Sequence, residues 1–329
     1  MGVKNLNRFL KDNCTKKSIR KIGLNCLQNK IVVIDASIYM YRYLTENALI
    51  EHMYLLLSTL LSNNIIPFFV FDGKPPEAKQ ALLKQRRLEK KEAELKYNTV
   101  FNDYEINQNV INTEKEKEIL NELKQLKQQF VRLHSDDIKR VKQLLTAYGV
   151  MYYESPNEAD EICAYLVKSG KAWACMSDDM DMFIYGCPFV MRNISLLNKT
   201  VLLYDTNEIL NELCMTPDHF KEIMVLSGTD YNINSHTNLD DTIELYSKYK
   251  QNIITDGLNK NVSFYTWLVE TSNYITNYDE LMHICGLFNM DNIPNVELDS
   301  IIIQNGPIDN DLLHEIMRNE GFVFTPTST

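Results

Sequence analysis

Residues 154–181, ESPNEADEICAYLVKSGKAWACMSDDMD, decide the fold of this chain. Two acidic clusters lie in this stretch: Glu158, Asp160 and Glu161, then Asp178, Asp179 and Asp181. Between the clusters, apolar residues recur at helical spacing over residues 159–168, and Gly170 suits a helix C-cap. Residues 172–176 are short and apolar, which is typical of a buried strand. The stretch therefore predicts a helix followed by a strand, the repeating unit of an α/β fold.

The acidic clusters are expected to face one pocket. Pro156 and Asn157 mark a helix start, so the first cluster falls in the first helical turn, and the second follows a strand. In open α/β sheets, ligands bind beyond the carboxyl ends of the strands. Crowded carboxylates take up protons or bind cations, and ligand sets made only of oxygen suit Mg²⁺ or Mn²⁺. The alternative is structural: acids at a helix start favour the helix dipole, and paired aspartates are common in turns.

Two earlier stretches repeat the same pattern. Residues 31–35, IVVID, are typical of a buried strand that ends in an acid, Asp35. Residues 65–71, IIPFFVF, predict another strand, which is followed by Asp72. A short helix is expected over residues 1–13, and a helical pattern continues from Tyr41 to the leucines at 55–61. Four acidic sites recur in one alternating pattern of strands and helices, which favours a shared functional site over a chance arrangement of acids.

Composition bounds the class of protein. With 329 residues the chain exceeds one ordinary core, so a large domain with appendages or two domains is expected. Its seven cysteines form no CxxC pair, which indicates a reducing, intracellular setting. The expected location is the nucleus or a viral cytoplasmic replication site. No apolar stretch is long enough to span a bilayer. The net charge of −10 argues against nucleic-acid binding, but residues 74–96 carry eight basic side chains against four acids.

Six motifs, in order, resemble those of the flap endonuclease family, which includes the XPG-type structure-specific 5′ nucleases. They are MGVKNL at 1–6, IVVIDAS at 31–37, VFDGKPPEAK at 70–79, SPNEAD at 155–160, SDDMDMFIYG at 177–186 and LSGTDY at 226–231. The resemblance covers about residues 1–95 and 135–250. It implies a PIN-like 5′ nuclease core: a mainly parallel central sheet flanked by helices, with a helical arch insertion and a reduced helical C-terminal region.

The resemblance also implies roles for individual residues. Its metal-binding carboxylates correspond to Asp35, Asp72, Glu158, Asp160, Asp179, Asp181 and Asp230. Asp160 stands where the family often has glutamate. Lys79 and Arg86, with the neighbouring Arg87, correspond to basic residues that contact nucleic acid, and Lys79, Arg86 and Asp181 are taken as catalytic. Tyr41 corresponds to an aromatic residue on which a base stacks, and Gly2 to a small residue packed close to the site.

The chemistry of these residue types agrees with such roles. Two Mg²⁺ ions about 3.5–4 Å apart can activate a water and stabilise the leaving oxygen of a phosphodiester, and Mn²⁺ is expected to substitute. Lysine and arginine neutralise charge that grows on the transferring phosphate. The alternatives are that Tyr41 belongs to the core, because Tyr39 and Tyr43 are close by, and that Lys79 and Arg86 are solvated helix charges.

Four regions are expected along the chain. Residues 1–96 form an N-terminal nuclease region, and residues 97–134 an arch or gateway. The arch is expected to begin with an aperiodic, Asn-rich stretch around 98–112 and to continue as a charged amphipathic helix over 114–133. Residues 135–230 complete the active site, and residues 231–329 hold a degenerate helix-turn-helix region with an acidic tail.

The clearest departure from the family follows Asp230. Residues 232–242, NINSHTNLDDT, lack the glycines that permit close approach of backbone to duplex DNA, and they add Asp240 and Asp241. No sliding-clamp peptide is recognisable at the C-terminus. The heavy use of Asn, Ile, Lys and Tyr is typical of an AT-rich genome, such as that of a large DNA virus or a parasite.

The sequence thus predicts a hydrolase, a Mg²⁺-dependent 5′ nuclease of the flap endonuclease or 5′–3′ exonuclease kind. Its expected partner is DNA with 5′ flaps, nicks or ends, in replication, repair or recombination. One alternative is a non-catalytic scaffold that keeps the nuclease core, although its complete carboxylate set argues against this. Another is a nuclease redirected to single-stranded nucleic acid or RNA, which the altered residues 232–242 motivate.

Overall fold

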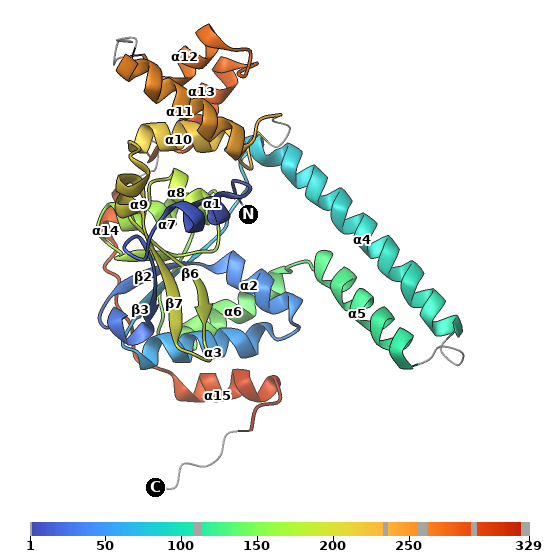
Figure 1. The fold of residues 1–329 in the computed structure, drawn as a ribbon. Coiled ribbons are helices and arrows are strands. Elements are labelled where there is room, and N and C mark those ends of the chain that lie inside the picture. Colours follow the sequence, from blue (N-terminus) through green and yellow to red (C-terminus); the bar gives the residue numbers. More distant parts are fainter. Residues whose placement is uncertain (1, 108–112, 233–235, 256–261, 291–294, 324–329) are drawn as a thin grey trace. The chain divides into compact units, whose positions relative to one another are not determined.

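The computed structural model describes residues 2–107, 113–232, 236–255, 262–290 and 295–323 (Figure 1). The chain forms two compact units, each assembled from three chain segments. The first unit comprises residues 1–36, 59–74 and 151–305, and the second comprises residues 37–58, 75–150 and 306–329. Segments far apart in sequence therefore build each unit.

A seven-stranded sheet forms the centre of the first unit. Its strand order is β1-β7-β6-β5-β2-β3-β4, and the strands span Ile19–Gly23 (β1), Ile31–Asp35 (β2), Ile66–Phe71 (β3), Tyr152–Glu154 (β4), Ala174–Met176 (β5), Phe189–Ser195 (β6) and Thr200–Asp205 (β7). Strands β4, β3, β2, β5 and β6 run parallel, and β7 pairs antiparallel with β6 and with β1. This confirms the prediction of a mainly parallel sheet flanked by helices.

The helices of the first unit follow the strands as an α/β pattern requires. They span Leu6–Asn13 (α1), Ala159–Lys168 (α7), Asp181–Ile184 (α8), Thr206–Leu213 (α9), Pro217–Leu226 (α10), Leu239–Thr255 (α11), Phe264–Thr271 (α12), Tyr278–Leu287 (α13) and Asn295–Ser300 (α14). Val33 and Phe68 of the sheet share one apolar cluster with Ile162 and Leu166 of α7. The helix predicted at 159–168 is α7, and the strand predicted at 31–35 is β2, each with the same bounds.

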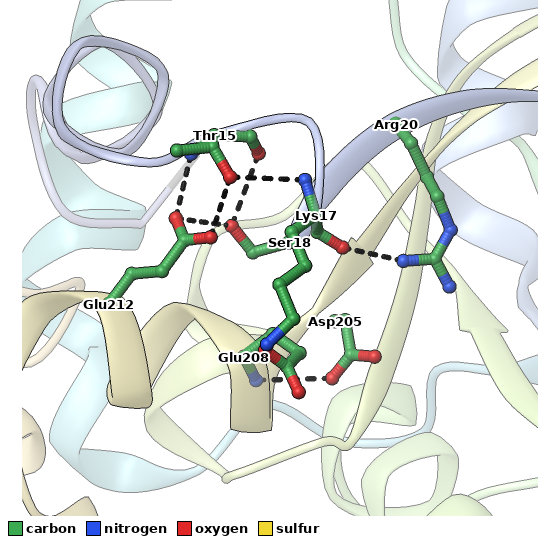
Figure 2. Close-up of polar contacts among 7 residues, drawn as sticks. All are labelled: Thr15, Lys17, Ser18, Arg20, Asp205, Glu208 and Glu212. Atoms are coloured by element: carbon green, nitrogen blue, oxygen red, sulfur yellow. Dashed lines mark hydrogen bonds and ion pairs between the residues drawn. The ribbon is translucent and has the colours of Figure 1, made fainter.

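A polar cluster ties the N-terminal segment to α9 (Figure 2). The Glu212 carboxylate accepts hydrogen bonds from the Thr15 N–H at 2.7 Å, the Thr15 hydroxyl at 2.7 Å and the Ser18 hydroxyl at 2.9 Å. These bonds lower the pKa of Glu212, because they stabilise its charged form. Lys17 forms an ion pair with Glu208, one helical turn before Glu212. The cluster fixes the chain between α1 and β1, and α1 leads back to Gly2.

The second unit is helical. Its helices are most of Ala36–Thr45 (α2) and of Leu49–Ser62 (α3), then Gln80–Asn107 (α4), Thr113–Gln129 (α5), Ser135–Ala147 (α6) and Asn310–Asn319 (α15), with a 3₁₀ turn at Glu77–Lys79. Helices α4 and α5 lie side by side as an antiparallel pair (Figure 1). The ring of Tyr97 stacks on Phe101 and meets Phe130 edge-on, with centroids 5.8 and 5.4 Å away.

Two details of the sequence prediction are wrong in this unit. Residues 98–107 are not aperiodic but continue α4, because Tyr97, Phe101 and Tyr104 recur at helical spacing, and the Tyr104 hydroxyl donates to Glu116 of α5. The helical pattern from Tyr41 to the leucines at 55–61 is two helices, since Asn47 adopts a positive φ of 56° between them. Residues 108–112 of the expected arch lie outside the described residues. Within the described ranges, no helix is long and apolar enough to cross a membrane.

Candidate active site

Asp35 ends β2 at the point where the order of the strands changes direction. Strands β3 and β4 lie on one side of β2, and β5 and β6 lie on the other. Ser177 directly follows β5, and its hydroxyl donates to the buried Asp35 carboxylate at 3.4 Å. Such a switch point opens a crevice at the carboxyl ends of the parallel strands. Asp35 therefore lies where an α/β sheet binds its ligands.

Asp179 and Asp181 are held beside the same strand end by a tight turn. The Ser177 hydroxyl accepts the Asp179 N–H at 3.1 Å, and the Asp179 carboxylate accepts the Asp181 N–H at 3.0 Å. Both side chains are buried, with exposed fractions of 5% and 2%. A buried carboxylate is costly unless hydrogen bonds or positive charge compensate it. Their place next to Asp35 makes a cation the chemically suited partner.

Gly2 lies directly against these two carboxylates. Its φ is +76°, and a Cβ there would sit 2.4 Å from Asp181 Oδ1 and 2.8 Å from Asp179 Oδ1. Real Cβ atoms do not approach oxygens so closely. Because glycine has no Cβ, a small space remains beside the two carboxylates, and any other residue would fill it. We call this space the cradle at Gly2.

Asp72 and Glu158 meet at the start of α7. Asp72 follows β3, and its Oδ1 accepts the N–H of Ala159, the first residue of α7, at 2.8 Å. Glu158 is the N-cap residue of the helix, and its Oε2 accepts the hydroxyl of Tyr231 at 3.1 Å. The N-terminus of a helix favours negative charge, so both acids occupy electrostatically suitable positions.

Asp160 lies in the first turn of the same helix. Burial raises the pKa of the Cys163 thiol to about 11, and the charges of Asp35 and Asp160 both add to the shift. The two carboxylates are therefore within electrostatic reach of a single buried thiol. That the acid clusters face one pocket stays a prediction.

Asp230 lies in a short segment after α10 that its neighbours fix. Asn232 Oδ1 accepts the N–H and the hydroxyl of Thr229 at 2.6 and 2.8 Å, and Asn232 Nδ2 donates to the Val225 carbonyl at 2.8 Å. Tyr231 extends from this segment to Glu158. Sequence reasoning gave Tyr231 and Asn232 no role, although Tyr231 ends the LSGTDY motif and Asn232 directly follows it.

Asp178 has a different environment from its acidic neighbours. Its carboxylate accepts the Asn193 N–H at 2.9 Å and lies 3.9 Å from the Arg192 guanidinium, which also donates to the Asp178 carbonyl at 2.7 Å. These contacts tie Asp178 to β6. Arg192 has no part in any sequence motif considered above, and its role is visible only in the structure.

The remaining predicted residues belong to the second unit. Tyr41 lies on α2, Lys79 in the 3₁₀ turn, and Arg86 and Arg87 on α4. Lys79 is buried, Tyr41 and Arg87 are exposed, and Arg86 is intermediate. The four residues occur in one unit with the basic run of α4. Their action on a substrate stays a prediction.

The donor set suits magnesium. In the part of the chain that the structure describes, no three His, Cys, Asp or Glu side chains stand close enough together to hold an ion. The acids around the strand ends offer only oxygen donors, however, and three of them are buried. Mg²⁺ prefers oxygen ligands and keeps several waters, so it needs only some of these side chains as direct ligands. Positive charge would also offset the repulsion between them.

Helix α11 begins in the segment where the sequence departs from the family. Asn238 Oδ1 accepts the Asp241 N–H at 2.9 Å, and Asn238 Nδ2 donates to the Asp241 carboxylate at 2.7 Å. Asp240 and Asp241 therefore occupy the first turn of a capped helix, where acids stabilise the helix dipole. Residues 233–235 of this segment lie outside the described residues.

A mainly parallel α/β sheet with acids at the carboxyl ends of its strands is an arrangement suited to metal-dependent hydrolysis. Comparison with known proteins specifies the family. Residues 1–93 match the XPG N-terminal domain, and residues 149–230 match the XPG I-region. The chain therefore belongs to the XPG-type flap endonuclease family and is a nuclease of the hydrolase class.

Individual relatives agree with this assignment. The chain is 32% identical over 238 residues to flap endonuclease 1 of Methanococcus aeolicus, covering 68% of each protein. It is 31% identical over 206 residues to flap endonuclease 1 of Methanocaldococcus jannaschii, covering 63% of this chain and 59% of that protein. The fold is similar to the catalytic core of Rad2 in complex with DNA substrate, with a TM-score of 0.65, 22% identity, and coverage of 98% of this chain and 95% of that one.

Proposed function

We propose that the protein is a Mg²⁺-dependent, structure-specific 5′ nuclease that cuts flapped, nicked or free-ended DNA and leaves a 3′-hydroxyl and a 5′-phosphate. The observation that carries the proposal is that buried Asp35, Asp179 and Asp181 follow the ends of β2 and β5 at the switch point of the sheet, with Gly2 leaving space beside the last two. The relatives with this architecture include flap endonucleases, and one structural neighbour is a complex with a DNA substrate.

Some residues of the chain would bind the metal ions, and others would orient these ligands. The residues that would hold the ions are Asp35, Asp72, Glu158, Asp160, Asp179, Asp181 and Asp230. When bound, two such ions supply an activated water and a stabilised leaving oxygen. Tyr231 orients Glu158 through its hydroxyl, and the Ala159 N–H orients Asp72. Each hydrogen bond removes rotational freedom, so that a carboxylate is held ready for its ligand.

The basic and aromatic residues of the second unit would handle the nucleic acid. Lys79 and Arg86 would neutralise charge on the scissile phosphate while water attacks phosphorus and the bond to the 3′ oxygen breaks. Tyr41 would stack on a base beside the cut. Arg86 and Arg87 of α4 would supply positive charge for the DNA strand, which the net charge of −10 does not suggest.

The adjacent acids Asp178, Asp179 and Asp181 provide a matched test. We expect Asp179→Asn and Asp181→Asn to reduce Mg²⁺-dependent cutting of an end-labelled 5′ flap by at least about a thousandfold, because loss of a ligand charge weakens the metal site. Asp178→Asn should keep the rate within about threefold, since its contacts are to β6 and an amide oxygen still accepts the Asn193 N–H. Circular dichroism verifies folding of each variant.

The outcomes separate the nuclease from its alternatives. Cutting at the flap junction that survives only in Asp178→Asn and wild type supports the proposal. No metal-dependent cutting of flapped, nicked or single-stranded DNA or of matched RNA, by a folded protein, contradicts it and favours a non-catalytic scaffold. Equal loss in all three variants would contradict the separate placement of Asp178.

A second candidate is a nuclease redirected to single-stranded nucleic acid or RNA. The observation that favours it is the start of α11, where Asp240 and Asp241 would repel a duplex backbone. The same panel decides between the two. Faster cutting of single strands or RNA than of a flapped duplex would support redirection.

A further inference from the structure

Lys90 connects Tyr41 to the α4–α5 pair. Its Nζ atom lies 5.2 Å from the centre of the Tyr41 ring, within the range of a cation–π interaction. The same Nζ donates to the backbone carbonyl of Val131, just beyond α5, at 2.9 Å. The ammonium group of Lys90, on α4, thus contacts a residue of α2 and donates a hydrogen bond to the segment that follows α5.

A neighbouring ion pair supports this junction. Arg132, next to Val131, donates to the Glu94 carboxylate at 2.9 Å, and Glu94 lies one helical turn after Lys90. The segment after α5 is therefore attached to α4 at two successive turns. A movement of α5 against α4 would carry the Val131 carbonyl away from Lys90 and would disturb the contact with Tyr41.

We propose that Lys90 is a positioning residue that fixes the orientation of the Tyr41 ring and makes it dependent on the packing of α4 against α5. The inference rests on the proposed function, in which Tyr41 stacks on a base beside the cut. The Tyr41 side chain is 41% exposed, so surface remains for a base while Lys90 contacts the ring. A ring already oriented loses less freedom when the base arrives.

The surroundings of Lys90 suit it to positioning the Tyr41 ring. Burial lowers its pKa, and the positive charges of Arg132 and Arg86 lower it further. A partly desolvated ammonium interacts more strongly with an aromatic ring than an exposed one does. Lys91, the next residue on α4, is exposed and provides a matched control.

A double-mutant cycle tests the connection. We expect Lys90→Met to slow single-turnover cutting of a 5′ flap by about five- to tenfold, which is the order of a partly desolvated cation–π contact. In a Tyr41→Leu background the same change should slow cutting by less than about twofold, because Lys90 acts through the ring. Lys90→Arg should restore most of the rate, and Lys91→Met should leave it near wild type. Multiplicative effects in the double variant would overturn the inference and indicate that Lys90 contacts the substrate independently.

A second measurement does not depend on cutting. In protein carrying ¹³C-labelled lysine, the ε protons of Lys90 should be shifted upfield by the Tyr41 ring current, with the signal assigned by its loss in Lys90→Arg. The shift should disappear in Tyr41→Leu. A Lys90 signal that Tyr41→Leu leaves in place would overturn the inference even if the enzyme cuts. Absence of cutting by wild type, with the shift present, would instead contradict the proposed function alone.

Discussion

At the residue scale, Gly2 shows how one missing methyl group shapes the candidate site. Gly2 and Gly170 have almost the same φ, +76° and +77°. Gly170 has nothing within 4 Å of the position that a Cβ would take, whereas Gly2 faces two carboxylate oxygens. Backbone strain would be alike at the two positions, so only the contact differs.

Comparing Gly2→Ala with Gly170→Ala should therefore separate the effect of contact with the carboxylates from the effect of backbone strain. We expect Gly2→Ala to reduce flap cutting by at least about tenfold, because the methyl group must displace Asp179 and Asp181, and misplacement of reacting groups is costly. Gly170→Ala should cost about 1 kcal/mol of stability and leave the rate per folded molecule unchanged. Single-turnover rates and thermal unfolding measure both effects. Equal rates in the two variants would show that the cradle at Gly2 has no part in the reaction.

At the scale of elements, helices α10 and α12 pack around a partly buried acid. Glu222 lies on α10, and its Oε2 has no hydrogen-bond partner among the described residues. Burial raises its pKa from 4.5 to about 7, and the charge of Asp218 adds to the shift. The hydroxyl of Tyr265, on α12, donates to the backbone carbonyl of Glu222 at 2.6 Å, so the acid lies where two helices pack.

The raised pKa of Glu222 makes stability depend on pH. Below its ordinary pKa of 4.5 both states hold the proton, and between 4.5 and about 7 only the folded state does. The free energy of unfolding should therefore fall as pH rises through this window, by about 1–3 kcal/mol in all, and level off above pH 7. Glu222→Gln should remove this part of the slope and exceed wild type in stability at pH 8.

Urea unfolding between pH 4 and 8 measures the difference between variant and wild type. Subtracting the two curves cancels the titration of all other groups. Glu270→Gln, at an exposed position on α12, should retain the wild-type slope. A difference curve for Glu222→Gln that is flat across the window would contradict the prediction.

At the scale of the whole molecule, the chain passes repeatedly between its two units, and the segment that begins at residue 306 belongs to the second unit. Gly306 N–H donates to the Gly149 carbonyl at 2.7 Å, and Asp309 N–H donates to the Ala147 carbonyl at 2.8 Å. Further on, the Phe322 ring lies 5.8 Å from that of Tyr54. Residues more than 150 positions apart thus hold α6 and α15 together.

Where the backbone at Gly149 crosses the backbone at Gly306, an added methyl group should reduce stability at Gly149 and much less at Gly306. At Gly149, φ is +65°, and a Cβ would lie 2.6 Å from backbone atoms of Gly306 and Pro307. We expect Gly149→Ala to reduce the free energy of unfolding by about 2–4 kcal/mol through strain and overpacking. Gly306→Ala should cost much less, since its nearest contact would be 3.4 Å. Thermal unfolding compares the two, and equal losses would contradict the crossing as described.

The sequence by itself determined several of the elements and the order of the acids. Apolar runs and helical spacing are local properties, so Ile31–Asp35 and Ala159–Lys168 could be predicted with their bounds. Placing acids at strand ends then followed from the rule that parallel strands end at one edge. The family motifs added the candidate roles of Gly2, Tyr41 and Lys79, which a local pattern could not supply.

Only the tertiary structure decided which of these residues meet. Asp178 and Asp179 are adjacent in sequence, but Arg192 and Asn193 of β6 bind the first, while the second lies beside Gly2. The pairing of Tyr231 with Glu158 likewise joins the segment after α10 to the start of α7. Such contacts join residues far apart along the chain, and strand register and side-chain packing set them, which no local pattern encodes.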